Sequence, residues 1–431
     1  MKTKNSNHLT LSIILFSIAV FFLNFYFKEF LLAGSRGDFI AFVFNNIQSF
    51  KSSFIFSIKN YGLLNDANWP LFYIIHAFGN PFSNNVDTYL LSTTLIGFLT
   101  FIILSFTIKN NNFSYIQSLA LASMILLMPW FNGRAHWGTY ENLGWFFLVI
   151  TFYFYSKIKL SSVEENSKNL TLFFTCFFSS IALYIRPAFA FFPIFFIITY
   201  FLSIEKFRYK IFIITYYLLL SIPGWYLIYL WGGIYDHKNS SVVIEVHSYK
   251  NIITNIPLIF NFFFFYLWPV YIFYIFDRGF KLFFKNHYLS FFLLIFIFTF
   301  LSINGDLRYL SNFTLGGGAI LELGYIMHDK YNIIFLLSSA LGGSFIFNII
   351  KKNFKNNFLL LIIIFVVFGY PKFLYQDYLE PLVYLLLFCG LLKTDLLELV
   401  KKYFNKVIVF YSIYLTLYNL TTIIYLNYHL T

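Results

Sequence analysis

The chain has 431 residues, of which 59% are hydrophobic, 24% aromatic and only 11% charged. Soluble domains carry about 25% charged residues, more than twice this share. A soluble core could not enclose 63 Phe and 34 Tyr side chains. With a mean hydropathy of +0.71, the composition excludes a soluble globular protein and predicts a chain whose solvent is the lipid bilayer.

The net charge of +12 does not indicate nucleic-acid binding, because the basic residues lie in short clusters between apolar runs. That distribution is typical of membrane topology. The two cysteines, Cys176 and Cys389, lie inside apolar runs without metal-ligand neighbours. We interpret them as small buried side chains.

The apolar runs predict an all-α, polytopic membrane protein with about 13 transmembrane helices, in a range of roughly 11 to 14. The runs near 130–145 and 185–187 could be tilted, re-entrant or broken. The first run follows Lys2 and Lys4 without a small-residue cleavage site, which favours a retained helix over a cleaved signal peptide. The predicted spans are 8–29, 87–108, 114–130, 142–156, 170–185, 187–204, 210–231, 256–276, 287–303, 331–350, 357–370, 377–393 and 406–427.

The charges between these spans predict a cytoplasmic N-terminus and an outer C-terminus. In that orientation the inner segments carry 19 basic and 6 acidic residues, and the outer segments carry 11 basic and 12 acidic residues. Cytoplasmic loops are enriched in Lys and Arg. Without an internal repeat or linker, residues 1–431 are predicted to form a single transmembrane domain.

The longest outer loop, 30–86, contains an amphipathic stretch at 39–59. Phe and Ile are interleaved there with Asn, Gln and Lys. This pattern predicts a helix lying in the plane of the membrane interface. A helix packed on the bundle is the alternative.

Asp38 follows the first span in Gly34-Ser35-Arg36-Gly37-Asp38, at the outer membrane boundary. A carboxylate there can act as general base for a sugar hydroxyl, or hold a divalent metal such as Mg²⁺ or Mn²⁺. Asp66 and His76 flank a Pro-aromatic turn later in the loop, which suits a polar substrate at the lipid boundary. A solvated turn at Asp38 and an interfacial aromatic belt around Trp69 are the alternatives.

The segment 129–141 carries Arg134, His136, Trp137 and Glu141 at the outer end of a predicted hairpin. Aromatic rings stack on sugar faces, and Arg pairs with phosphate in a bidentate manner. Arg186 lies between two apolar runs, where a charge is costly and usually faces a cavity or a partner. A snorkelling Arg at the headgroups is the alternative.

A third group of polar residues begins the penultimate span. Asp377 and Glu380 are three residues apart, so they share one face of a helix, with Gln376 beside them. Two acids at the first turn of a transmembrane helix favour a polar, substrate-binding cavity there. A helix N-terminal cap is the alternative.

Together these features resemble the GT-C membrane glycosyltransferases, in particular poorly characterised bacterial members. The resemblance rests on the inner N-terminus followed by an outer loop with the early Asp38, on Arg186-Pro187, on the hairpin 131–141 and on the motif 375–381. It departs from the family in one respect: family members often carry two adjacent acids after the first helix, whereas Asp38 lies between Gly37 and Phe39.

The resemblance implies a multi-pass protein of the bacterial inner membrane with a GT-C-like fold. It implies inverting transfer of a sugar from a polyprenyl-phosphate-linked donor to a lipid-linked glycan or cell-envelope acceptor on the extracytoplasmic face. Asp38 would act as base, with Asp66 as the next candidate. Arg134 and Arg186 would bind the donor phosphate, and His136 and Glu141 would assist.

Two other functions fit the same residues. An O-antigen or capsule polymerase also handles lipid-linked substrates on the outer face. A transporter or flippase for lipid-linked glycans would instead place ionisable residues near the middle of its spans. Here they gather at one face, which favours an enzyme.

Overall fold

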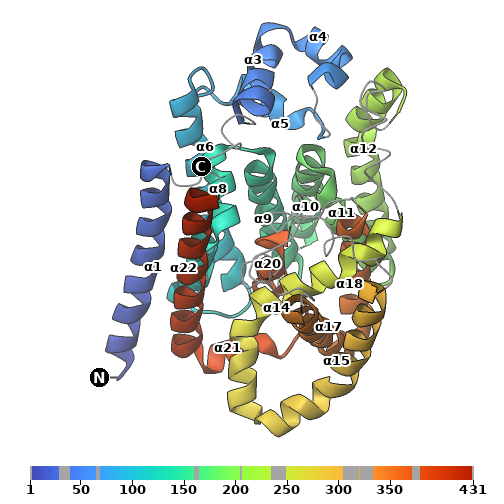
Figure 1. Cartoon of the computed structure of the whole chain (residues 1–431). Coiled ribbons are helices and arrows are strands. Elements are labelled where there is room, and N and C mark those ends of the chain that lie inside the picture. The colour runs from blue at the N-terminus through green and yellow to red at the C-terminus, as the bar shows by residue number, and fades with distance from the viewer. Residues whose placement is uncertain are drawn as a thin grey trace. The chain divides into compact units, whose positions relative to one another are not determined.

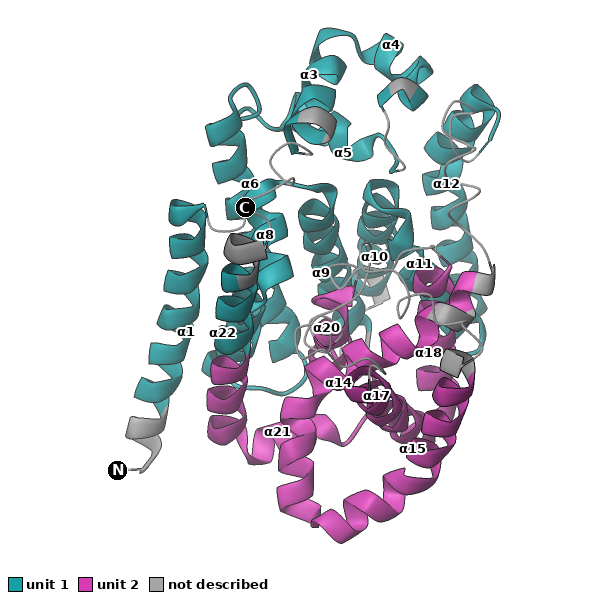
Figure 2. Ribbon diagram, viewed as in Figure 1, with its two compact units in different colours: residues 1–244, 415–431 teal, residues 245–414 magenta. Residues whose placement is uncertain are grey.

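Every element that the structure describes is a helix or a helical turn, as shown in the computed structural model of Figure 1. The described residues are 2–28, 39–64, 68–159, 165–203, 206–233, 249–303, 320, 333–370 and 379–429. They contain no strand, which confirms the all-α prediction for these ranges. They form two compact units, unit 1 (1–244 and 415–431) and unit 2 (245–414), coloured separately in Figure 2.

Unit 1 consists of long apolar helices and several short helical segments. Along the row α1–α7–α6–α9–α10–α12, each helix contacts the next. In chain order the elements are α1 (Lys2–Phe27), η1 (Phe39–Phe44), α3 (Asn45–Ser52), α4 (Phe54–Lys59), η2 (Tyr61–Leu64), α5 (Leu71–Ile74), η3 (Ile75–Gly79), α6 (Val86–Lys109), α7 (Tyr115–Ser123), η4 (Met124–Leu127), α8 (Pro129–Trp137), α9 (Tyr140–Lys159), α10 (Glu165–Ile185), η5 (Pro187–Ala190), α11 (Phe191–Phe201) and α12 (Phe207–Trp231).

The short helices between α1 and α6 form what we call the cap, residues 39–64 and 68–85. Figure 1 shows α3, α4 and α5 together beyond one end of α9 and α10. Within the predicted amphipathic stretch the chain forms η1, α3 and α4. Ile47 and Phe50 of α3 are fully buried in one cluster with Leu143 and Ile185 of the long helices. This face of α3 is therefore buried: α3 contacts η1, η3 and α5, and α5 in turn contacts α10.

Unit 2 is organised around one long helix, α14 (Tyr249–Arg278). It contacts all of the other complete helices of the unit. These are α15 (Phe280–Ile303), α17 (Ile333–Lys352), α18 (Phe354–Gly369), α20 (Leu382–Phe388) and α21 (Leu396–Lys402). The last helix, α22 (Phe404–His429), begins in unit 2 and ends in unit 1.

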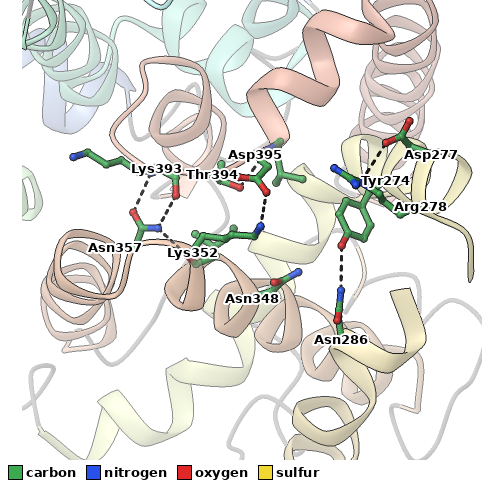
Figure 3. Close-up of polar contacts among 12 residues, drawn as sticks. Tyr274, Asp277, Arg278, Asn286, Asn348, Lys352, Asn357, Lys393, Thr394 and Asp395 are labelled. Atoms are coloured by element: carbon green, nitrogen blue, oxygen red, sulfur yellow. Dashed lines mark hydrogen bonds and ion pairs between the residues drawn. The ribbon is translucent and has the colours of Figure 1, made fainter. Parts of the chain in front are cut away.

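Polar side chains connect the predicted inner segments at one end of unit 2 (Figure 3). The buried Asn357 donates from Nδ2 to the carbonyl oxygens of Ile349 and Lys393, at 2.7 and 2.9 Å, and accepts from the Lys393 backbone N–H at 3.0 Å. Lys352 pairs with Asp395 at 2.5 Å. Segments predicted to share the cytoplasmic side therefore lie together within this unit.

The chain is a helical membrane protein. Among the described residues, 8 helices are long and apolar enough to cross a bilayer, or 9 if the bent pair Tyr115–Leu127 and Pro129–Trp137 is one span. That pair is bent by 73°, inside the predicted span 114–130. Helix α8 ends at Trp137 and α10 ends at Ile185, so helices end in both regions where the sequence indicated irregular spans. The predicted span 377–393 holds only the short α20 among its described residues. The count of 13 stays a prediction.

Gly342 allows α17 to approach α14 at backbone contact distance. A Cβ atom at position 342 would lie 1.8 Å from the carbonyl oxygen of Phe260, closer than any two such atoms can come. Asn261 of α14 donates to the Ser338 hydroxyl of α17 at 2.6 Å beside this contact. Small residues and interhelical hydrogen bonds hold helices together where lipid removes the hydrophobic driving force.

Gly342→Ala should therefore destabilise unit 2 by about 1–3 kcal/mol, because the two backbones must move apart to admit the methyl group. Leu337→Phe adds more volume on an exposed position of the same helix and should have little effect. Thermal unfolding in detergent, followed by circular dichroism, measures both. Equal unfolding midpoints for the two variants would contradict the role assigned to Gly342.

Candidate functional site

Arg186 is placed by the proline that follows it. Proline has no N–H and disfavours helical backbone in the residue before it. Helix α10 accordingly ends at Ile185, and Arg186 adopts extended backbone angles (φ −144°, ψ 113°) before the turn η5. Its side chain thus leaves the helix axis at the end of α10, next to the first turn of α9.

The hairpin between α8 and α9 brings Glu141 to the same place. Pro129 occupies the first turn of α8, and Gly138 ends the helix in the left-handed conformation (φ +63°). Any side chain at Gly138 would also collide with Tyr89, since a Cβ would lie 2.6 Å from its ring. The glycine therefore permits both the turn and the close approach of the hairpin to α6.

Glu141 and Arg186 form a buried ion pair. Arg186 Nη1 lies 2.8 Å from Glu141 Oε1, and the two side chains are 6% and 1% exposed. Burying two charges is costly unless each has a partner. The pair therefore fixes the relative positions of α9 and the end of α10.

Arg134 supplies a second positive charge to the same carboxylate. Both guanidinium groups act electrostatically on Glu141. Each is also covered by an aromatic ring: Arg134 Cζ lies 5.1 Å from the centroid of Trp137, and Arg186 Cζ lies 5.8 Å from that of Tyr140. Two guanidinium groups thus converge on one carboxylate among the described residues, and guanidinium groups are also the side chains that bind phosphate in a bidentate manner.

Hydrogen bonds to α6 indicate the depth of this cluster. Tyr89 donates from its hydroxyl to the carbonyl oxygen of Gly138 at 2.5 Å, and Asn142 donates from Nδ2 to that of Thr93 at 2.7 Å. Tyr89 and Thr93 lie in the first two turns of α6, so the cluster lies roughly 5–10 Å inside that end of the helix. It is therefore near one membrane boundary and away from the middle of the spans.

Trp137 offers a hydrogen-bond donor at the same cluster. Its indole Nε1 is buried and has no acceptor among the residues that the structure describes. The indole nitrogen can only donate, so a ligand oxygen would satisfy it. Trp137 was predicted to bind substrate, and this geometry is compatible with that role.

His136, also predicted to bind substrate, has both ring nitrogens engaged within the protein. Nδ1 lies 3.1 Å from the Thr94 hydroxyl, and Nε2 lies 3.1 Å from the Phe21 carbonyl oxygen. These contacts connect α8 to α6 and α1. They give His136 a structural role in holding these three helices together. Its contact with a substrate stays a prediction.

His76 lies in the cap, packed between Phe72 and Tyr89 with ring centroids 4.7 and 5.0 Å away. Asn80 Nδ2 donates to its Nδ1 at 3.1 Å, which leaves the proton on Nε2. That nitrogen is buried with no partner in the described part of the chain. Burial lowers the pKa of His76 from 6.5 to about 3, so this imidazole is neutral at physiological pH.

The remaining predicted site residues do not belong to the cluster formed by the described residues. Asp38, Asp66, Gln376 and Asp377 lie outside the described residues. Glu380 belongs to unit 2, where it is buried and accepts a hydrogen bond from the Tyr266 hydroxyl. The structure thus brings together Arg134, Trp137, Glu141 and Arg186.

Sequence reasoning named the charged members of the cluster but missed Tyr140 and the supporting Asn142. An aromatic ring directly before an acid near a predicted membrane boundary was the available signal for Tyr140. Among the described residues, no three His, Cys, Asp or Glu side chains come together as a metal site. Asp38 and Asp66, the carboxylates expected to meet an acceptor or a metal, are not described.

Comparison of the chain with protein-family models, with characterised proteins and with solved structures finds no match.

The ion pair can be tested by removing its charges singly and together. Glu141→Gln should destabilise unit 1 by about 3–5 kcal/mol, because Arg186 keeps a buried charge that has lost its partner. Glu141→Leu combined with Arg186→Met should recover part of this loss, since neither charge then remains buried. Thermal unfolding in detergent measures all variants. A double variant less stable than the single one would show that the pair itself is not the source of the effect.

His76 predicts a pH dependence of stability. Its pKa of about 3 in the folded protein lies below the ordinary 6.5, so the unfolded chain binds a proton that the folded chain excludes. The contribution of His76 is fully present above pH 6.5 and is lost as the pH falls towards 3. The unfolding midpoint should therefore drop more steeply on acidification in the wild type than in His76→Gln. Parallel curves for the two proteins would refute this.

Proposed function

We propose that this protein is a glycosyltransferase of the bacterial inner membrane. It transfers a sugar from a polyprenyl-phosphate-linked donor to a lipid-linked glycan or cell-envelope acceptor on the extracytoplasmic face. The observation that supports this most is the buried Glu141–Arg186 pair with Arg134 acting on the same carboxylate. A lipid-linked phosphate is an anion that arrives at this depth of a bilayer.

The proposed reaction is one displacement at the anomeric carbon of the donor sugar. The acceptor hydroxyl oxygen forms the new bond to that carbon, its proton passes to Asp38, and the bond to the phosphate oxygen breaks with inversion. Negative charge grows on the departing polyprenyl phosphate. Arg134 and Arg186 would stabilise that charge, which is the usual task of preorganised cations near a leaving group.

Glu141 has a different task in this proposal. It touches Arg186 at 2.8 Å and therefore orients the guanidinium before the phosphate arrives. A carboxylate committed to two arginines is a poor base, because the cations stabilise its charged form. The base is therefore assigned to Asp38 and not to Glu141.

The depth of the cluster favours an enzyme over a transporter. Ionisable residues of transporters lie near the middle of the spans, where alternating access takes place. Arg186 follows the last residue of α10, and Glu141 lies in the first turn of α9. Both belong to helix ends, where an acceptor from the aqueous side can meet a donor from the lipid.

The test is transfer of a labelled sugar from a panel of polyprenyl-phosphate sugars in proteoliposomes. Asp38→Asn should lower turnover by about two to four orders of magnitude, the usual contribution of a positioned base. Arg186→Lys keeps the positive charge but loses the planar guanidinium group that donates two parallel hydrogen bonds to a phosphate. It should lower turnover by about a hundredfold and also weaken donor binding.

Arg208→Lys is the matched control. It makes the same substitution in the first turn of α12, at the predicted cytoplasmic end, and should leave transfer unchanged. Equal transfer by Arg186→Lys and Arg208→Lys would remove the arginine cluster from the site. Full transfer by Asp38→Asn would remove Asp38 as the base and make Asp66 the next candidate.

A further inference from the structure

The cap carries a group of exposed apolar side chains. We call it the apolar edge and define it as Phe54, Ile55, Phe56, Phe78 and Phe82. Their side chains are 42%, 67%, 59%, 61% and 56% exposed. The rings of Phe54 and Phe78 lie 5.8 Å apart, so α4 and η3 meet at this edge.

The apolar edge is distinct from the face of the cap that packs inward. In α4 the inward residues are the buried Ser57 and the half-buried Ile58, whereas Phe54, Ile55 and Phe56 point outward. A helix facing water would have the opposite arrangement, with its polar residues outside. The sequence of α4 therefore suits an apolar surrounding on its outer side.

Contacts with α12 indicate the depth at which this edge lies. Trp231, the last residue of α12, donates from Nε1 to the Ile58 carbonyl oxygen at 3.0 Å and stacks on Tyr61 at 5.2 Å. The last two turns of α12 also carry the exposed Trp225, Tyr226 and Tyr229. Exposed Trp and Tyr at the end of a span mark the membrane interface, so α4 sits at that interface.

Basic residues border the apolar edge. Lys59 ends α4 and is exposed, and Lys51 ends α3. Lys51 also donates to the Asn84 side chain at 2.7 Å, which holds α3 against the turn that carries Phe82. Apolar side chains bordered by lysines are the pattern of segments that lie on a lipid surface.

We propose that the apolar edge inserts into the outer boundary of the same bilayer that unit 1 crosses. The five side chains would lie among the upper acyl chains, with Lys51 and Lys59 at the headgroups. The sequence predicted a single interfacial helix over residues 39–59. The apolar edge is a different surface: it includes η3, which lies outside that range, and it leaves out α3, whose apolar face is buried. The inference does not depend on the proposed function.

The consequence concerns the charged cluster below the cap. Inward residues of the cap pack against Leu143 and Ile185, the neighbours of Glu141 and Arg186. Lipid contact on the outer side therefore fixes the height of the cap over the ion pair. A cap anchored in this way keeps the buried charges covered at their membrane boundary.

The test is site-directed labelling in proteoliposomes of phosphatidylcholine with phosphatidylglycerol as the minor lipid. Both native cysteines are buried and are first replaced by alanine. An environment-sensitive fluorophore is then attached to Phe56→Cys or Phe78→Cys. Asn45→Cys, at the exposed start of α3, is the matched control. Each labelled protein must keep the thermal unfolding midpoint of the unlabelled one.

Labels at positions 56 and 78 should emit at shorter wavelength than the label at 45. They should also be quenched several-fold more strongly by a nitroxide carried on lipid near the headgroup. Quenching of all three labels by aqueous iodide to the same extent would overturn the proposal. Protection from iodide without quenching by the lipid nitroxide would also overturn it, because a protein surface would then cover the edge.

Discussion

A hydrocarbon solvent offers no hydrogen-bond partner to a peptide group and no counter-ion to a charge, and this constraint explains most of the fold. Backbone groups must be satisfied within each segment, so every described element is helical. Charges must find partners inside the protein. Glu141 and Arg186 do so at 2.8 Å, and this pair connects two helix ends that the sequence keeps far apart.

The same constraint explains how the helices of each unit are held together. Lipid is as apolar as a leucine side chain, so burial of apolar surface gives little preference for helix contact over lipid contact. Specific contacts take its place. In unit 2 they are the close approach of two helices at Gly342 and the hydrogen bonds from the Asn357 side chain to the carbonyl oxygens of Ile349 and Lys393. In unit 1 they are the bonds from His136 and Asn142 to neighbouring helices.

The charged cluster and the cap depend on each other within unit 1. The cluster needs a dry environment for its ion pair to remain strong, and the cap supplies apolar cover through Leu143 and Ile185. The cap in turn stays in place through hydrogen bonds such as Trp231 to Ile58. In the proposed reaction, the donor phosphate would meet cations that already have fixed positions.

Much of this architecture could be predicted from sequence because its causes are local. Pro187 interrupts a helix through its missing N–H and its effect on the preceding residue, so the break at 186 was expected. The break at 128 was not, because the predicted span 114–130 runs through it. Arg186 stood out because a charge between apolar runs needs a partner. The composition by itself required a helical membrane protein.

Other features were decided only by the tertiary structure. Hydropathy cannot distinguish a side chain that faces protein from one that faces lipid, because both surroundings are apolar. It therefore could not tell that Ile47 and Phe50 turn inward while Ile55 and Phe56 turn outward. Sequence spacing could not pair Glu141 with Arg186 either, or engage His136 with α1 and α6. Such contacts join distant segments, and only the packing of the helices brings them within reach.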